Sequence, residues 1–253
     1  MSRPAPLADE LDRLFTDDLA HCRGMLVTPD DDRSFAPARE LLSAGALDDV
    51  LERFDRSHGG GTDRRAVASL WSQWYFGTLV PPAVAAGLLL DRRLPLGIEE
   101  VGVLLDPETA RPVAFRLPHE GTVDPGAAPF ARFDGLVRRH VAPLVETLAP
   151  HVGLSPDTVW TNAGRYVQWI LDEIERSRGE ADVARSGRRL LDAKDWPDGG
   201  ENPLHDTIRY VDRAGRSVPR RRVCCLQYLI PDLEGCGELC PLPHVREESA
   251  GST

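Results

Sequence analysis

The chain has 253 residues, of which 42% are hydrophobic and 28% are charged. This composition is typical of a globular protein that buries a sizeable core. With 30 basic and 40 acidic side chains the net charge is −10, which argues against a general nucleic-acid binder because such a protein needs a basic surface.

The amino-terminal residues, "MSRPAPLADELDRL", contain no apolar segment of the kind that directs secretion. The longest apolar run, residues 76–90, contains two prolines and is too short to cross a bilayer. We therefore expect a cytoplasmic protein without a membrane span. In that compartment clustered cysteines stay reduced, so they are more often metal ligands than disulfides.

Helical periodicity dominates the first part of the chain. Leucines and one phenylalanine recur at helical spacing over residues 7–19. Cys22, just beyond them, is expected to be a buried thiol. A second helix is predicted over residues 37–56, and it ends at the glycines of "HGGG".

The next segment is rich in aromatic residues. Thr62 and Asp63 are favourable N-caps for a helix that carries "AVASLWSQWYFGTL". Its Trp74 and Tyr75 are candidates for lining a pocket, although aromatic side chains on a helix most often belong to the core. After "VPP", a further helix is predicted over residues 82–91, because proline interrupts a helix but is tolerated in a first turn.

The hydrophobic period then changes from that of a helix to that of a strand. Apolar residues alternate over 101–105 and 113–117, on either side of the turn "DPETAR", which predicts a β-hairpin. Two longer helices follow. One is predicted over residues 133–148, with an internal proline that can kink it, and the other begins at Ser155, a favourable N-cap, and continues to residue 174.

The remainder of the chain is more polar. Residues 176–189 are expected to be exposed, and "DTIRYV", residues 206–211, is expected to be a short strand. We therefore predict an α+β fold with three parts: a mainly helical body with a small β-hairpin at 1–200, a C-terminal cysteine-rich module at 201–245, and a disordered tail at 246–253.

Four of the five cysteines lie in the stretch "CCLQYLIPDLEGCGELC", residues 224–240. A disulfide between the adjacent Cys224 and Cys225 would close a strained ring. Structural zinc sites use Cys-x₂₋₄-Cys pairs, which fits Cys236 and Cys240 but not the adjacent pair. An iron–sulfur cluster is a larger object that adjacent thiolates can reach, so the residues favour a cluster, with zinc as the alternative.

Two histidines, His205 and His244, lie near the cysteines in the sequence. They would be ligands in a Rieske-type cluster, which needs two histidines on one iron. Because four cysteines are available, we expect the cysteines to be the ligands.

The cysteine stretch resembles the C-terminus of the FhuF-type ferric-siderophore reductases, whose pattern is Cys-Cys-x₁₀-Cys-x₂-Cys. Three further segments are similar to that family: "SQWYFGTLVPPAVAAGLLL", "NAGRYVQWILDEI" and "NPLHDTIRYV…RRRVCCLQYLIP". The chain departs from the pattern in the last gap, which has three residues between Cys236 and Cys240 instead of two. We expect a wider loop at Gly237 to absorb the extra residue.

The resemblance implies a 2Fe–2S cluster and an oxidoreductase. The ligands carried over from the pattern are Cys224, Cys225, Cys236 and Cys240. The implied reaction is the one-electron reduction of a ferric siderophore, with the hydroxamate type favoured, and release of Fe(II) for iron acquisition. The sequence contains no Gly-x-Gly-x-x-Gly motif and no P-loop, so we expect an external electron donor such as a ferredoxin or a flavoprotein.

Arg220, Arg221 and Arg222 lie just before the cysteines. They are candidates for raising the reduction potential of a cluster or for attracting an anionic complex or an acidic electron donor; a solvated turn is the other interpretation. Trp74 and Tyr75 complete the candidate docking residues. Two other functions stay open, a zinc-stabilised interaction module and an iron–sulfur electron carrier.

Overall fold

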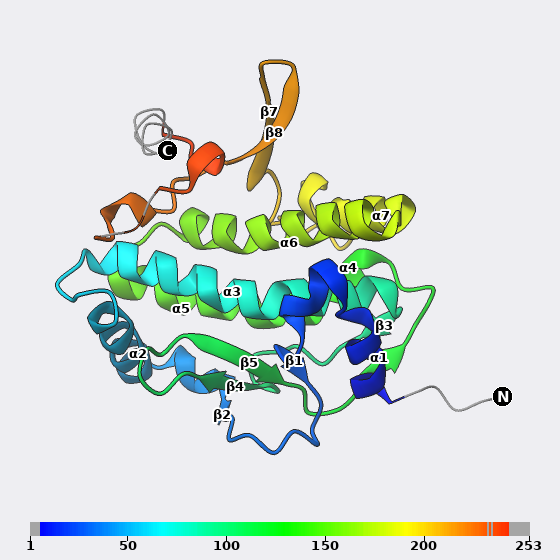
Figure 1. The fold of residues 1–253 in the computed structure, drawn as a ribbon, viewed down its shortest axis with the longest axis horizontal. Helices are drawn as coiled ribbons and strands as arrows, with labels where there is room; N and C mark the ends of the chain where they lie inside the picture. Colours follow the sequence, from blue (N-terminus) through cyan, green and yellow to red (C-terminus); the bar gives the residue numbers. More distant parts are fainter. Residues whose placement is uncertain (1–5, 232, 234, 243–253) are drawn as a thin grey trace.

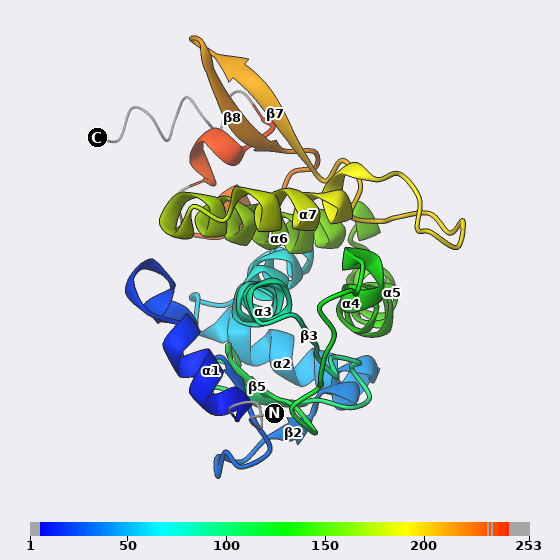
Figure 2. The same cartoon turned by 90° about the vertical axis from the view of Figure 1, so that its right-hand side faces the viewer.

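Two layers of helices pack against a small sheet in a computed structural model of the chain, which describes residues 6–231, 233 and 235–242 (Figure 1). Helix α3 (Arg64–Leu89) lies in the middle layer, and α6 (Pro156–Arg178) and α7 (Ala181–Asp192) form the outer layer (Figure 2). The sheet covers the opposite side of α3. The structure confirms the α+β class with a mainly helical body. Within the described residues, no helix is long and apolar enough to span a membrane.

The other helices surround α3. They are α1 (Leu7–Leu14), α2 (Ala44–Arg56), α4 (Pro129–Leu136) and α5 (Ala142–Val152), joined by the 3₁₀ helices η1 (Asp17–Cys22) and η2 (Ala38–Leu42) and the π-helical turn η3 (Val137–Val141). The helix predicted over 37–56 is therefore two helices. They are separated at Ser43, whose extended backbone and hydroxyl, which accepts from the N–H of Ala46, start α2.

The predicted hairpin is the centre of a four-stranded sheet with the order β1-β5-β4-β2. Strands β4 (Gly102–Leu105) and β5 (Pro112–Arg116) are antiparallel, as predicted. The outer strands β1 (Leu26–Val27), which is parallel to β5, and β2 (Ala36–Pro37) have two residues each. Strands this short show no period in the sequence. A second, two-stranded sheet consists of β3 (Arg92–Arg93) and β6 (Thr122–Val123).

Helix α3 continues through Pro81 and Pro82, so the prediction of a separate helix over 82–91 was wrong. The two prolines remove two N–H donors from the helix. Nearly every side chain of α3 from Ala66 onward is buried, as in a helix that is covered on all sides by protein. Packing on all sides of α3 outweighs the missing hydrogen bonds.

Residues 176–189 are not simply an exposed polar stretch, because most of them belong to the end of α6 and to α7. Helix α7 buries Ala184, Gly187 and Leu190. A β-carbon at Gly187 would lie 2.8 Å from a methyl of Leu88 in α3, so a glycine is needed for this close approach. An apolar face this narrow, made of small residues, is not recognisable in the sequence.

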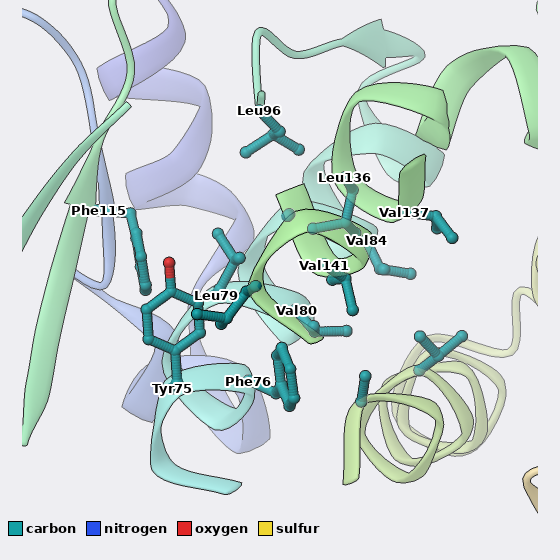
Figure 3. Close-up of a cluster of buried hydrophobic side chains, with 14 of the residues drawn as sticks. Tyr75, Phe76, Leu79, Val80, Val84, Leu96, Phe115, Leu136, Val137 and Val141 are labelled. Atoms are coloured by element: carbon teal, nitrogen blue, oxygen red, sulfur yellow. The ribbon is translucent and has the colours of Figure 1, made fainter. Parts of the chain in front are cut away.

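The helix predicted over 133–148 is interrupted by η3, one turn before the proline that was expected to kink it. This turn places His140 in the core, where Nε2 lies 2.6 Å from the Tyr75 hydroxyl and Nδ1 lies 2.7 Å from the carbonyl oxygen of Leu96. Figure 3 shows Tyr75 among the apolar side chains of α3, β5 and the α4–η3 segment. Tyr75 is fully buried, so its prediction as a docking residue was wrong.

We expect His140 to make the protein less stable as the pH falls from 7 to 5. Burial lowers the pKa of His140 from 6.5 to about 4, so below pH 6.5 the unfolded chain binds a proton that the native state does not bind. The free energy of unfolding therefore decreases on acidification until about pH 4, by about 2 kcal/mol between pH 7 and 5. Urea unfolding of the wild type and of His140→Gln at both pH values measures this. The same pH dependence in both proteins would contradict it.

Candidate functional site

The cysteine segment is attached to the helical body by a β-hairpin. Strands β7 (Ile208–Arg213) and β8 (Arg216–Arg221) pair along their whole length and project from the outer helical layer (Figure 1). The base of the hairpin packs on α6, where a β-carbon at Gly164 would lie 2.8 Å from the β-carbon of Thr207. The predicted strand over 206–211 is confirmed as β7. Its partner β8 was not predicted.

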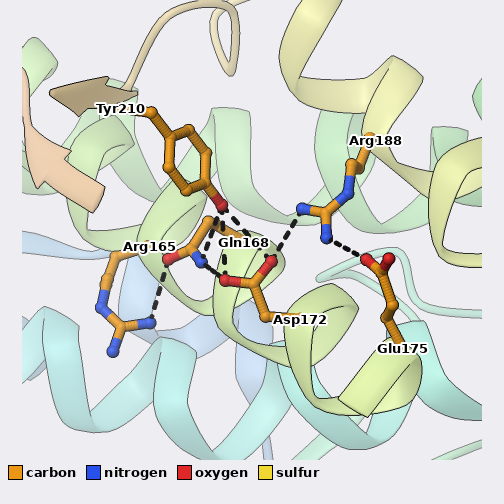
Figure 4. A network of polar contacts seen from close by, with 6 residues as sticks. All are labelled: Arg165, Gln168, Asp172, Glu175, Arg188 and Tyr210. Carbon is orange, nitrogen blue, oxygen red and sulfur yellow. Dashed lines mark hydrogen bonds and ion pairs between the residues drawn. The ribbon is translucent and has the colours of Figure 1, made fainter. Parts of the chain in front are cut away.

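A polar network holds the hairpin against α6 and α7 (Figure 4). The Tyr210 hydroxyl lies 3.3 Å from both carboxylate oxygens of Asp172 and accepts from the Gln168 amide at 3.2 Å. Arg188 of α7 donates to Asp172 and to Glu175, both at 2.8 Å. The orientation of the hairpin, and with it the position of the cysteines, therefore depends on side chains of α6 and α7, which precede the hairpin in the sequence.

The four cysteines lie on two short turns that follow β8. Leu226, with a left-handed φ of 60°, precedes the 3₁₀ turn η4 (Gln227–Leu229), and Gly237, with a φ of 57°, begins the 3₁₀ turn η5 (Gly237–Leu239). The three residues of the last gap, Gly237–Leu239, form this 3₁₀ turn, whereas a wider loop at Gly237 was expected from the sequence. Cys225 and Cys240 are buried and Cys224 and Cys236 are half-buried.

The turns bring cysteines from both ends of the segment together. The Cys236 thiol donates a hydrogen bond to the sulfur of Cys225, which lowers the pKa of Cys225 and raises that of Cys236. Burial raises the pKa of Cys224, and the charges of Cys225 and Cys240 add to this effect. In the described part of the chain, no three histidine, cysteine or acidic side chains are arranged to hold a single metal ion.

Arg221 connects this segment to the body. Its guanidinium is buried, with Nη1 donating to Asn162 of α6 at 2.7 Å and Nη2 to Gln73 of α3 at 2.9 Å. The Ser69 hydroxyl of α3 donates to the carbonyl oxygen of Cys225 at 2.7 Å.

Arg220, Arg221 and Arg222 were named from the sequence as candidates for docking or for tuning the potential of a cluster. Burial of Arg221 is compatible with the second role and not with docking, and its charge acts on Cys225. Arg220, by contrast, is half-buried and Arg222 is exposed.

The four thiols and the neighbouring Arg221 suit a bound group that is negatively charged and ligated by sulfur. All four candidate ligands are thiols, as an iron–sulfur cluster requires. Arg221 lies beside them, and its buried Nε has no hydrogen-bond partner within the described residues. A buried cation with a free donor next to four thiols is a favourable environment for a cluster of negative charge.

A cavity of about 600 Å³ lies beside Trp74 of α3. It is bounded by α3, α6, the β4–β5 turn and η1, and its wall contains Trp74, Arg111, Arg165, Tyr166 and Trp169. Trp74 was predicted from the sequence, and the other four side chains were not. The aromatic residues and the arginine of α6 occur in "GRYVQW", which carried the family resemblance without indicating a pocket.

A smaller hollow of about 230 Å³ separates this cavity from the cysteine segment. Trp74 and Tyr166 line both spaces, and the smaller one is also lined by Gln227 and Leu233 of the cysteine segment. Trp74 and Tyr166 therefore lie between the arginine-lined cavity and a hollow that the cysteine segment lines through Gln227 and Leu233.

A helical body with a four-cysteine C-terminal segment beside a ligand-sized cavity defines a class of candidate redox proteins. The family described as "Ferric iron reductase FhuF-like transporter" matches residues 69–218, from α3 to β8, and the chain belongs to this family. It is also 31% identical over 179 residues to the "Ferric siderophore reductase" of Escherichia coli (strain K12). That alignment covers 70% of this chain and 66% of the relative. The family match ends before Cys224.

Proposed function

We propose that this protein is a cytoplasmic ferric-siderophore reductase whose C-terminal cysteine-rich module, residues 201–245, holds a 2Fe–2S cluster. The ligands are Cys224, Cys225, Cys236 and Cys240. The observation that carries the proposal is the placement of four free thiols on two short turns that follow the strand of the buried Arg221. Membership of the family and the similarity to a ferric siderophore reductase support the substrate class.

When bound, the cluster supplies one electron at a time, which matches the reduction of one Fe(III) to Fe(II). The electron comes from an external protein donor, a ferredoxin or a flavoprotein, and is accepted by the ferric complex. The siderophore's own bonds stay intact. Its hard oxygen donors hold Fe(II) much less tightly than Fe(III), so the iron leaves as Fe(II), and a hydroxamate siderophore is the favoured substrate.

The chain's own residues hold the site and tune its electrostatics. Arg221 places a fixed positive charge beside thiolates that together carry several negative charges, and this favours the more negative, reduced state. The bonds of Arg221 to Asn162 and Gln73 keep that charge in place. The hydrogen bond from Ser69 fixes the backbone of Cys225 at the start of the segment.

The test is an anaerobic single-turnover reduction. We expect the purified protein to be brown, to contain about two irons and two sulfides per chain, and to lose visible absorbance on addition of dithionite. After removal of dithionite, a ferric hydroxamate complex should restore the absorbance while a ferrous chelator traps Fe(II). NADPH without a donor protein should support no turnover. A colourless protein with stoichiometric zinc would contradict the proposal and would favour an interaction module.

A further inference from the structure

The cavity beside Trp74 has the size and lining of a ligand site. Its volume of about 600 Å³ lies in the range of small-molecule sites, which are mostly apolar with a few convergent polar groups. The apolar part of its wall includes Trp74, Tyr166 and Trp169, and the polar part includes Arg111 and Arg165. Three other hollows among the described residues are smaller, with volumes of about 280, 230 and 220 Å³.

Arg165 is a half-buried cation that forms no ion pair within the described residues, although the more distant charge of Asp172 acts on it. Burial and the neighbouring charge of Arg221 lower its pKa. Its guanidinium donates to the Gln168 side chain at 3.4 Å (Figure 4), and no carboxylate within the described ranges lies within ion-pair distance of it. A partly desolvated guanidinium is stabilised by an oxygen acceptor, so the cavity favours a ligand that brings oxygen atoms.

Arg111 provides a second cation in the same cavity. Its Cζ lies 3.4 Å from the centroid of the Trp74 ring, which holds the guanidinium by a cation–π contact. The nearby Asp106 uses its carboxylate within its own turn, where Oδ1 accepts from the N–H groups of Glu108 and Thr109 and from the Thr109 hydroxyl. The donors of Arg111 are therefore not consumed by Asp106.

The cavity is also well placed for electron transfer. Trp74 and Tyr166 form its boundary with the smaller hollow that the cysteine segment lines through Gln227 and Leu233. Gln73, which lies next to Trp74 and lines the smaller hollow, is hydrogen-bonded to Arg221. A ligand in the cavity is thus separated from the cysteine segment by the side chains of Trp74 and Tyr166 and by the smaller hollow.

We propose that this cavity is the binding site for the ferric siderophore. Arg111 and Arg165 donate to the oxygen atoms of its iron-binding groups, and Trp74 and Trp169 pack against its organic part. The complex is an oxygen-rich ferric chelate that is neutral or anionic, because Arg111, Arg165 and Asp106 together leave one excess positive charge in the cavity, which disfavours a cationic ligand. This inference rests on the proposed function, since a protein that reduces no siderophore needs no such site.

The test is binding of a gallium(III) tris-hydroxamate complex, measured by isothermal titration calorimetry. Gallium(III) resembles Fe(III) in size and charge but does not accept an electron, so binding is measured apart from reduction. We expect Arg165→Gln and Arg111→Gln each to raise Kd by about tenfold or more, as loss of a charge-assisted hydrogen bond does. Arg185→Gln is the matched control, because Arg185 is exposed on α7 and pairs with the exposed Asp182.

A steric variant tests the same cavity without removing a charge. Gly77 lines the cavity, and a β-carbon there would lie 3.0 Å from the Tyr166 ring and hydroxyl. Gly77→Val should therefore narrow the cavity and weaken gallium-complex binding. The visible spectrum and the circular dichroism of each variant show whether the cluster and the fold are retained.

The outcomes separate this inference from the proposed function. If all three cavity variants bind the gallium complex as tightly as the wild type, the siderophore binds elsewhere and the inference is wrong, while reduction by the wild type still supports the proposed function. If the wild type neither binds the gallium complex nor reduces the ferric one, both proposals fail. Weaker binding in all three cavity variants, with Arg185→Gln unchanged, supports the cavity as the site.

Discussion

Replacing Cys236 with serine should abolish the visible absorbance of the protein and decrease the rate of ferric-siderophore reduction by about two orders of magnitude or more, because thiolates are the ligands of such clusters. Serine is nearly the same size, but its hydroxyl is a much poorer iron ligand. Iron and sulfide content, the visible spectrum and single-turnover reduction measure the effect.

The matched control is Cys22→Ala. Cys22 is also a buried cysteine, as the sequence analysis predicted, and burial raises its pKa to about 12. It lies in η1, outside the cysteine segment. Its removal should therefore leave the iron content and the visible spectrum unchanged. Full iron content and full reduction in Cys236→Ser would refute the role assigned to the cysteine segment.

Replacing Arg221 with methionine should destabilise the protein by about 3 kcal/mol and make the reduction potential of the cluster more negative. The instability follows from the buried Asn162 and the half-buried Gln73, whose side chains lose their charged donor. The change in potential follows from the loss of the cation beside the cysteines. Urea unfolding and a redox titration followed by visible absorbance measure the two effects separately.

The control for this prediction is Arg216→Met, in the same hairpin. Arg216 begins β8 and is exposed, whereas Arg221 ends the same strand and is buried. We expect Arg216→Met to change the free energy of unfolding by less than about 0.5 kcal/mol, as is usual for surface substitutions, and to leave the potential unchanged. If Arg221→Met and Arg216→Met had the same potential, Arg221 would have no electrostatic role at the cysteines.

The local patterns of the sequence predicted most of the secondary structure. Alternation predicted the β4–β5 hairpin, and a long apolar face predicted α6. The start of α6 was predicted from Ser155, although its side chain makes no capping hydrogen bond in the structure. Local rules were wrong at Pro81 and Pro82, where burial on all sides keeps α3 continuous. The predicted tail at 246–253 lies outside the described residues.

The sequence by itself determined the family and the chemistry of the candidate ligands, because thiol type and spacing are local properties of "CCLQYLIPDLEGCGELC". The tertiary structure decided which side chains from other elements lie near that segment and around the cavity. It buried Tyr75 beside His140, placed Arg221 rather than Arg222 in the protein interior, and joined Trp74 with Arg111, Arg165, Tyr166 and Trp169 around one cavity. These side chains come from elements far apart in the chain, and only the packing of α3 against α6 and β5 brings them together.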